Sequence, residues 1–151
     1  MLEKNIQTLF GNWLKTVNLR TPACFELKLE KGKSFAVDKV AEHQIYYLRR
    51  AKLGLYYKIP DMFSADGYAS RKPFDTFWMV TNLAMVVLVF YTPRKSKRCY
   101  FIDVDAFETL KTQILPRKSL TMELLDSSPL VSLICDLGDS NLSKLDSLVV
   151  E

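Results

Sequence analysis

The run from Ala84 to Tyr91 constrains the fold of this chain most, because every residue in it is apolar. Successive side chains of a strand point to opposite faces of the sheet, so a run without polar alternation needs cover on both faces. The run is far shorter than the roughly 20 apolar residues that span a bilayer. We therefore expect the central strand of a sheet, with helices packed on both of its faces.

Helix and strand patterns alternate along the rest of the chain. Apolar residues spaced by three and four indicate helices, and short alternating or β-branched runs indicate strands. The second helix is expected to start near Ser34 or Asp38, since either side chain can cap a helix, and to end at Gly54. These patterns predict an α/β fold with a mixed central β-sheet flanked by helices. The expected helices cover residues 2–17, 34–53 (or 38–53) and 105–115, and the expected strands cover residues 23–30, 55–59, 76–81, 84–91 and 99–104.

The length of the chain is that of one domain. A chain of 151 residues buries a substantial core but is short for two domains. The patterns weaken after Pro116, so we expect an α/β domain over residues 1–116 and a C-terminal extension over residues 117–151. For the extension three structures stay open: a strand or two, a packed helix, or a tail that binds a partner.

Charge and cysteine content narrow the classes of function. Residues 1–116 hold 18 basic and 11 acidic side chains, a net charge of +7 that favours a polyanionic partner but is also ordinary for a globular domain. The three cysteines are widely spaced, with no CxxC motif and one histidine, so we expect neither a zinc site nor a disulfide framework. Glu3, Lys4 and Gln7 interrupt any signal-peptide pattern, which predicts a cytoplasmic protein.

Glu26 and Lys28 are the first candidates for chemistry. In a strand they point to one face, while Phe25, Leu27 and Leu29 point to the other, which suits a core. A carboxylate beside an ammonium group on a half-buried strand is what a metal-dependent nuclease uses, since the carboxylate holds Mg²⁺ and the lysine orients the attacking water. A simple ion pair on a surface strand has the same pattern, and both interpretations stay open at this point.

The order of several short motifs resembles a known family. Phe25-Glu26-Leu27-Lys28, Ser34-Phe35 and His43-Gln44, followed by strands at Val86–Tyr91 and Tyr100–Asp103, are similar to the RecU-type Holliday-junction resolvases and their phage relatives, in the PD-(D/E)XK nuclease superfamily. The resemblance covers roughly residues 10–110.

The resemblance implies a restriction-endonuclease-like core and a metal-dependent endodeoxyribonuclease that cleaves branched DNA in recombination or repair. It implies Mg²⁺ or Mn²⁺ as cofactor, no nucleotide cofactor, a homodimer, and a bacterial or phage-infected cell. In this family pattern Glu26 is a metal ligand, Lys28 the catalytic lysine and Gln44 a residue that faces the same site. His43 contacts DNA or water, or is a structural hydrogen-bonding residue.

One departure from the family pattern concerns the second acid. The family places an aspartate on the strand before Glu-x-Lys, but the only acidic residue before Glu26 here is Glu3. Mg²⁺ prefers two or more protein oxygens. The Pro-Phe-Asp segment that ends at Asp75 is the substitute expected, with the halves of the motif in exchanged order. If the strand that begins at Asp75 pairs beside residues 23–30, Asp75 and Glu26 share one metal. Asp61 is then a second ligand or a loop contact. The alternative role of Asp75 is to cap a turn.

Basic side chains around this region are expected to hold the DNA backbone by charge, although basic turns are often only solvated. Two other functions stay open: a nuclease of the same superfamily with another DNA substrate, and a non-catalytic DNA-binding or adaptor protein with a degenerate site. The positions expected to contact DNA are Lys31, Lys33, His43, Arg49, Lys58, Arg71, Lys72, Arg94, Lys95, Lys97 and Arg98.

Overall fold

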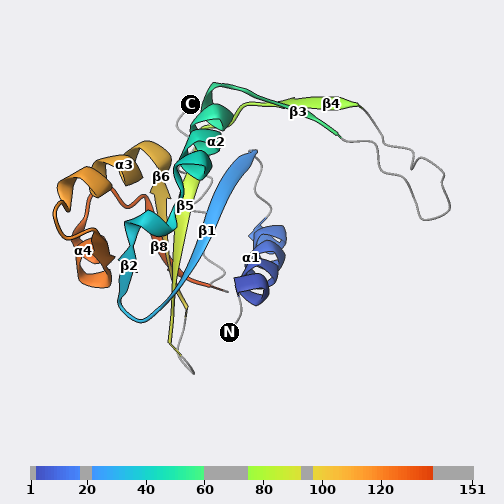
Figure 1. Cartoon of the computed structure of the whole chain (residues 1–151). Helices are drawn as coiled ribbons and strands as arrows, with labels where there is room; N and C mark the ends of the chain where they lie inside the picture. The colour runs from blue at the N-terminus through green and yellow to red at the C-terminus, as the bar shows by residue number, and fades with distance from the viewer. Residues whose placement is uncertain (1–2, 18–21, 60–74, 93–96, 138–151) are drawn as a thin grey trace.

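The computed structural model of the chain describes residues 3–17, 22–59, 75–92 and 97–137 (Figure 1). Helices and strands follow one another in the order that the sequence patterns predict, with additional short elements. The elements are α1 (Glu3–Val17), β1 (Ala23–Lys31), β2 (Ser34–Ala36), a 3-10 turn (Val37–Lys39), α2 (Glu42–Leu53), β3 (Leu55–Lys58), β4 (Thr76–Met79), β5 (Leu83–Tyr91), β6 (Arg98–Asp103), α3 (Val104–Gln113), β7 (Ser119–Thr121), α4 (Met122–Ser127) and β8 (Leu133–Asp136).

Four strands form the central sheet, in the order β1-β5-β6-β8. β1 runs parallel to β5, whereas β6 is antiparallel to both of its neighbours. The expected α/β class with a mixed central sheet flanked by helices is therefore confirmed. β1 lies at one edge of the sheet and pairs along its whole length with β5, with Glu26 opposite Val86.

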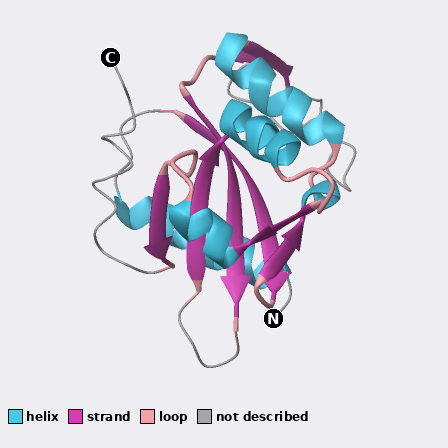
Figure 2. Cartoon of the chain, turned by 90° about the vertical axis from the view of Figure 1, so that its left-hand side faces the viewer, coloured by secondary structure: helices cyan, strands magenta, loops and turns pink. Residues whose placement is uncertain are grey.

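The predicted central strand is β5, and it is buried on both faces of the sheet. Val86 and Leu88 pack in one core with α2 and α3, whereas Met85 and Val87 pack in a second core with α1. The views in Figures 1 and 2 show the strands running side by side between these helices. Alternate side chains of β5 thus enter the cores on the two faces of the sheet, as expected from the sequence.

The second helix starts later than expected. Neither Ser34 nor Asp38 caps it: Ser34–Ala36 form β2, Asp38 lies in the 3-10 turn, and α2 begins at Glu42. The reason is a long-range pairing, because β2 is antiparallel to β7 and buries Phe35 completely. The expected end of the helix is confirmed: Gly54 caps it with a φ of 121°, a value that favours glycine.

Much of the C-terminal extension belongs to the same core. β7 pairs with β2, and β8 pairs with β6 at the far edge of the central sheet. Leu120 and Leu125 are fully buried in the core shared with α2 and α3. Of the structures left open by the sequence, residues 117–137 thus form two strands and a short packed helix, and residues 138–151 lie outside the described residues.

A two-stranded hairpin stands apart from the central sheet. β3 and β4 pair with each other, with Leu55 opposite Met79 and Lys58 opposite Thr76, and extend away from the end of α2 (Figure 1). The condition set for a metal shared by Asp75 and Glu26, that the strand beginning at Asp75 pairs beside β1, is therefore not met. β1 already has β5 as its neighbour on the inner side, and the chain that leaves α2 at Gly54 pairs with its own return strand.

A substitution at Phe101 tests the packing of the core beneath α1. Its ring lies 6.0 Å from that of Phe10, 6.2 Å from that of Trp13 and 6.0 Å from that of Phe25, measured between centroids. Truncation to alanine leaves a cavity that three aromatic rings surround. We expect Phe101→Ala to lower the free energy of unfolding by about 3–5 kcal/mol, measured by urea denaturation.

Leu53→Ala is the matched control, because this side chain is 76% exposed at the end of α2. We expect it to change the free energy of unfolding by less than about 0.5 kcal/mol. Equal effects of the two substitutions would contradict the packing described here.

Candidate functional site

The polar face of β1 meets α2. Phe25, Leu27 and Leu29 pack in the core beneath α1, as the alternation predicts. Glu26 and Lys28 point to the opposite face, on the side of the sheet that α2 covers, where Gln44 reaches Glu26. An edge strand with a helix over one face leaves these two charges half-buried: the Lys28 side chain is 17% exposed and that of Glu26 is 25% exposed.

Gln44 bridges the helix and the strand. Its Oε1 accepts a hydrogen bond of 2.9 Å from the backbone N–H of Ala41, the residue that caps α2. This contact decides the orientation of the amide, so the NH₂ group points the other way and donates to Glu26 Oε1 over 2.6 Å. Gln44 therefore both satisfies the helix N-terminus and holds the carboxylate of Glu26 in place.

Lys28 contacts the same carboxylate oxygen. Its Nζ lies 3.0 Å from Glu26 Oε1. A carboxylate that receives a cation and an amide donor on one oxygen is oriented, and neither of these two contacts uses its second oxygen, Oε2. Three of the four residues predicted to be catalytic thus meet, because Lys28 and Gln44 both contact Glu26.

A cavity of about 410 Å³ opens beside this cluster. Glu26 and Gln44 line it together with apolar side chains, among them Cys24, Tyr47 and Leu55. Burial raises the pKa of the Cys24 thiol, so this side chain is a neutral part of the wall at physiological pH. Glu26 also borders a second cavity, of about 360 Å³, beneath α1.

The second acid expected from the sequence lies elsewhere. Asp75 precedes β4 at the outer end of the hairpin, where its backbone carbonyl accepts a hydrogen bond from Ile59. Four residues of extended strand, about 13 Å, separate it from Met79 at the base of the hairpin. Asp61 lies outside the described residues, and within the described ranges no group of three or more His, Cys, Asp and Glu side chains is placed to hold a metal. The roles of Asp75 and Asp61 as metal ligands stay predictions.

The expected DNA contacts differ in their surroundings. Lys31 and Lys33 are exposed in the turn between β1 and β2, His43 is exposed in the first turn of α2, and Lys58 is exposed at the end of β3. Arg49 and Arg98 are instead paired with acids, Arg49 with Asp105 over 3.1 Å and Arg98 with Asp126 over 2.9 Å. Lys97 is half-buried, and the remaining four (Arg71, Lys72, Arg94 and Lys95) lie outside the described residues.

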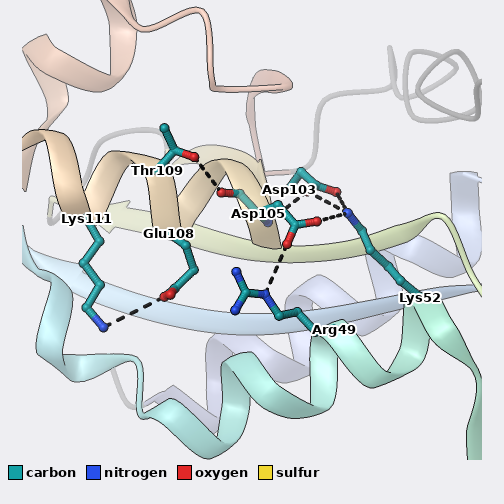
Figure 3. A network of polar contacts seen from close by, with 7 residues as sticks. All are labelled: Arg49, Lys52, Asp103, Asp105, Glu108, Thr109 and Lys111. Carbon is teal, nitrogen blue, oxygen red and sulfur yellow. Dashed lines mark hydrogen bonds and ion pairs between the residues drawn. The ribbon is translucent and has the colours of Figure 1, made fainter.

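An ion-pair network attaches the outer face of α2 to α3 (Figure 3). Lys52 donates to Asp103 over 2.8 Å and to Asp105 over 2.9 Å, and Asp103 caps α3 by accepting from the backbone N–H of Asp105. Burial opposes the charged form of Lys52, but the hydrogen bonds to both aspartates outweigh it and raise its pKa. The sequence patterns did not indicate the pairing of these aspartates with Lys52 or with Arg49.

Two further residues of the site escaped the sequence interpretation. Tyr47 and Leu55 both line the cavity beside Glu26. Tyr47 stands three residues after Gln44, a spacing that puts two side chains on the same face of a helix, so this signal was available. No local sequence pattern indicates that Leu55 lines the cavity, because the position of Leu55 depends on the direction in which the chain leaves Gly54.

Comparisons with models of protein families, with curated proteins and with solved structures found no match to this chain. In the part of the chain that the structure describes, no helix combines the length and the apolar character that crossing a bilayer requires.

Asp105 gives a prediction for acid stability. Its hydrogen bond with Lys52 lowers its pKa from 3.8, despite an opposing effect of burial, so the unfolded chain binds this proton more readily than the folded one. Its stabilising contribution is therefore complete above pH 3.8 and is lost as the pH falls through the folded-state pKa. At pH 6 we expect Asp105→Asn to lower the free energy of unfolding by about 1 kcal/mol or less.

Urea denaturation at a series of pH values between 6 and about 2.5 measures this difference. The gap between the wild type and Asp105→Asn should narrow as the pH falls below 3.8. A gap that stays constant over this range would show that the carboxylate charge of Asp105 contributes nothing.

Proposed function

We propose that this protein is a metal-dependent endodeoxyribonuclease that cleaves branched DNA in recombination or repair, like the Holliday-junction resolvases that its motifs resemble. The observation that carries the proposal is the contact of Glu26 with both Lys28 and Gln44. These residues were selected by their order in the sequence, yet they come from a strand and a helix that meet only in the folded chain. A mixed sheet with helices on both faces is compatible with the restriction-endonuclease-like core of that superfamily.

The chemistry of the donors fits a hard divalent cation in part. Mg²⁺ and Mn²⁺ take carboxylate, backbone carbonyl and water oxygens. Glu26 offers Oε2, since Lys28 and Gln44 both contact Oε1. When bound, such an ion polarises the phosphoryl oxygen and lowers the pKa of a bound water. A second carboxylate would complete the site. Asp75 and Asp61 remain the acids predicted for it, although the pairing of β4 with β3 carries Asp75 away from β1.

Lys28 and Gln44 have distinct roles in this proposal. Lys28 places a positive charge beside the reacting phosphate and stabilises the negative charge that builds there. Gln44 is a positioning residue, because its amide holds the carboxylate of Glu26 without contacting the substrate. The exposed lysines of the β1–β2 turn bind the DNA backbone. A homodimer is proposed because two symmetric incisions in a junction need two sites.

One alternative function has an observation in its favour. Lys28 already neutralises Glu26 in a direct ion pair, and such a pair is stable without a metal. This contact favours a non-catalytic DNA-binding or adaptor protein that keeps the fold with a degenerate site. A nuclease of the same superfamily with another DNA substrate is the remaining alternative, and a panel of substrates separates it from a resolvase.

Cleavage of a labelled four-way junction in Mg²⁺ or Mn²⁺ tests the proposal. We expect Glu26→Ala and Lys28→Ala to lower the cleavage rate by a factor on the order of 100 or more while junction binding in EDTA is kept. Glu30→Ala is the matched control, because Glu30 lies on the same face of β1 but pairs with Lys39. Junction binding without cleavage in either metal would refute the resolvase, and binding without cleavage of any substrate in the panel would favour the adaptor.

The lysines of the β1–β2 turn provide a second, independent test. Replacing Lys31 and Lys33 together by alanine should weaken junction binding for every sequence tested. The slope of the logarithm of affinity against the logarithm of salt concentration should decrease by about 2.

Arg98→Ala is the control for charge alone. This arginine is also exposed, but it is paired with Asp126, so we expect a smaller change in slope. An equal change for the two proteins would mean that the DNA does not lie along the β1–β2 turn.

A further inference from the structure

The cavity beside Glu26 has an aromatic wall. Tyr47 lines it from α2. This residue is 57% exposed, so its aromatic ring is not part of the hydrophobic core. Backbone phosphates are held by cations and by hydrogen-bond donors. An exposed aromatic ring at the mouth of the cavity is suited to a different part of a nucleotide, the flat face of a base.

The aromatic surface continues from the cavity onto the hairpin. Leu55 lines the cavity, and strand alternation places Tyr57 on the same face of β3 as Leu55. Phe77 lies directly opposite Tyr57 on β4, and the two rings are 5.3 Å apart between centroids. Tyr57 is 49% exposed and Phe77 is 39% exposed. Tyr47, Leu55, Tyr57 and Phe77 are called the aromatic track below.

Gly54 ties the base of the hairpin to α2. The ring of Trp78, on the opposite face of the hairpin from Tyr57, lies so close to Gly54 that a Cβ atom there would be 2.1 Å from the ring. This contact leaves no room for a side chain at the junction. The direction of the aromatic track relative to the cavity therefore depends on this glycine as well as on the strand pairing.

A positive charge lies beside the aromatic track. Arg50 is exposed three residues after Tyr47, on the neighbouring surface of α2. Lys58 is exposed at the end of β3, on the other face of the hairpin with Tyr56. Aromatic rings interleaved with cations are the pattern of proteins that bind single-stranded nucleic acid, in which bases stack on the rings and phosphates contact the cations. In duplex DNA the bases are already stacked on one another, so exposed rings of this kind gain nothing from it.

We infer that the aromatic track binds an unpaired stretch of DNA that leads into the cavity containing Glu26 and Gln44. The inference deepens the proposed function and rests on it for the position of this strand next to the reacting phosphate. The net charge of residues 1–116, +7, favours a polyanion over a second copy of the chain as the occupant. The substrate is then a branch or flap with unpaired nucleotides at the cut, in preference to a fully paired junction.

Binding of a fluorescein-labelled oligothymidylate to the full chain, measured by anisotropy in EDTA, tests the inference. We expect Tyr47→Ala and Tyr57→Ala each to weaken binding of this single strand by about fivefold or more, and to leave binding of a duplex of equal length unchanged. Tyr47→Phe keeps a ring and should retain the affinity of the wild type. Circular dichroism of each variant verifies that it is folded.

The chain offers a matched control for each variant. Tyr46→Ala removes a neighbouring tyrosine that is 58% exposed but does not line the cavity with Glu26. Tyr56→Ala removes a tyrosine that is 61% exposed on the opposite face of β3. Neither control should weaken binding of the single strand as much as its neighbour does.

Three outcomes would overturn the inference. One is equal binding of the single strand by the wild type and both test variants; another is an equal loss in the test and control variants. The third is that the test variants sediment as monomers and the wild type as a dimer, with no change in DNA binding. That result would make the track an interface between copies of the chain.

Failure of the inference and failure of the proposed function give different results. Because the binding assay contains no metal, it reports on the track whether or not the protein cleaves DNA. Selective loss in Tyr47→Ala without any cleavage activity in the wild type would support the track and refute the nuclease. Cleavage that is lost in Glu26→Ala, together with single-strand binding that Tyr47→Ala does not change, would support the nuclease and refute the track.

Discussion

The parallel pairing of β1 with β5 is the constraint on which the rest of the structure depends. Two neighbouring parallel strands cannot be joined by a tight turn, so the chain between them has to cross over one face of the sheet. Here the crossover contains α2, which packs against both strands. Because α2 covers the face of β1 that carries Glu26 and Lys28, Gln44 comes into contact with Glu26. The cluster at the candidate site is therefore a consequence of the sheet topology.

Two polar contacts attach α2 at opposite ends. At its start the amide of Gln44 links the backbone of Ala41 to the carboxylate of Glu26, and near its end Lys52 links the helix to Asp103 and Asp105. The apolar side chains of α2 between these ends, Ile45, Leu48 and Ala51, are buried. Polar contacts at both ends and burial between them thus fix the position of α2, which suits a site that has to orient a half-buried carboxylate.

The differences between the structure and the sequence interpretation share a physical cause. The pairing beside β1 that was the condition for Asp75 is absent, because the chain after Gly54 pairs with its own return strand. The start of α2 was misplaced because β2 pairs with β7, more than 80 residues later in the chain. Arg49 and Arg98 were expected to contact DNA, and the fold pairs them with Asp105 and Asp126. In each case the deciding partner is distant in sequence, and no local pattern identifies it.

The sequence by itself determined three features of the elements and their faces: the doubly buried β5, the alternation of β1 that turns Glu26 and Lys28 away from the core beneath α1, and the end of α2 at Gly54. These features follow from the periodicity of the backbone, which is local. Only the tertiary structure decided which strand neighbours β1, that Gln44 and Lys28 share one oxygen of Glu26, and that aromatic side chains lead to the cavity. Those contacts depend on which surfaces are buried against one another, a property of the whole chain that short stretches of sequence do not contain.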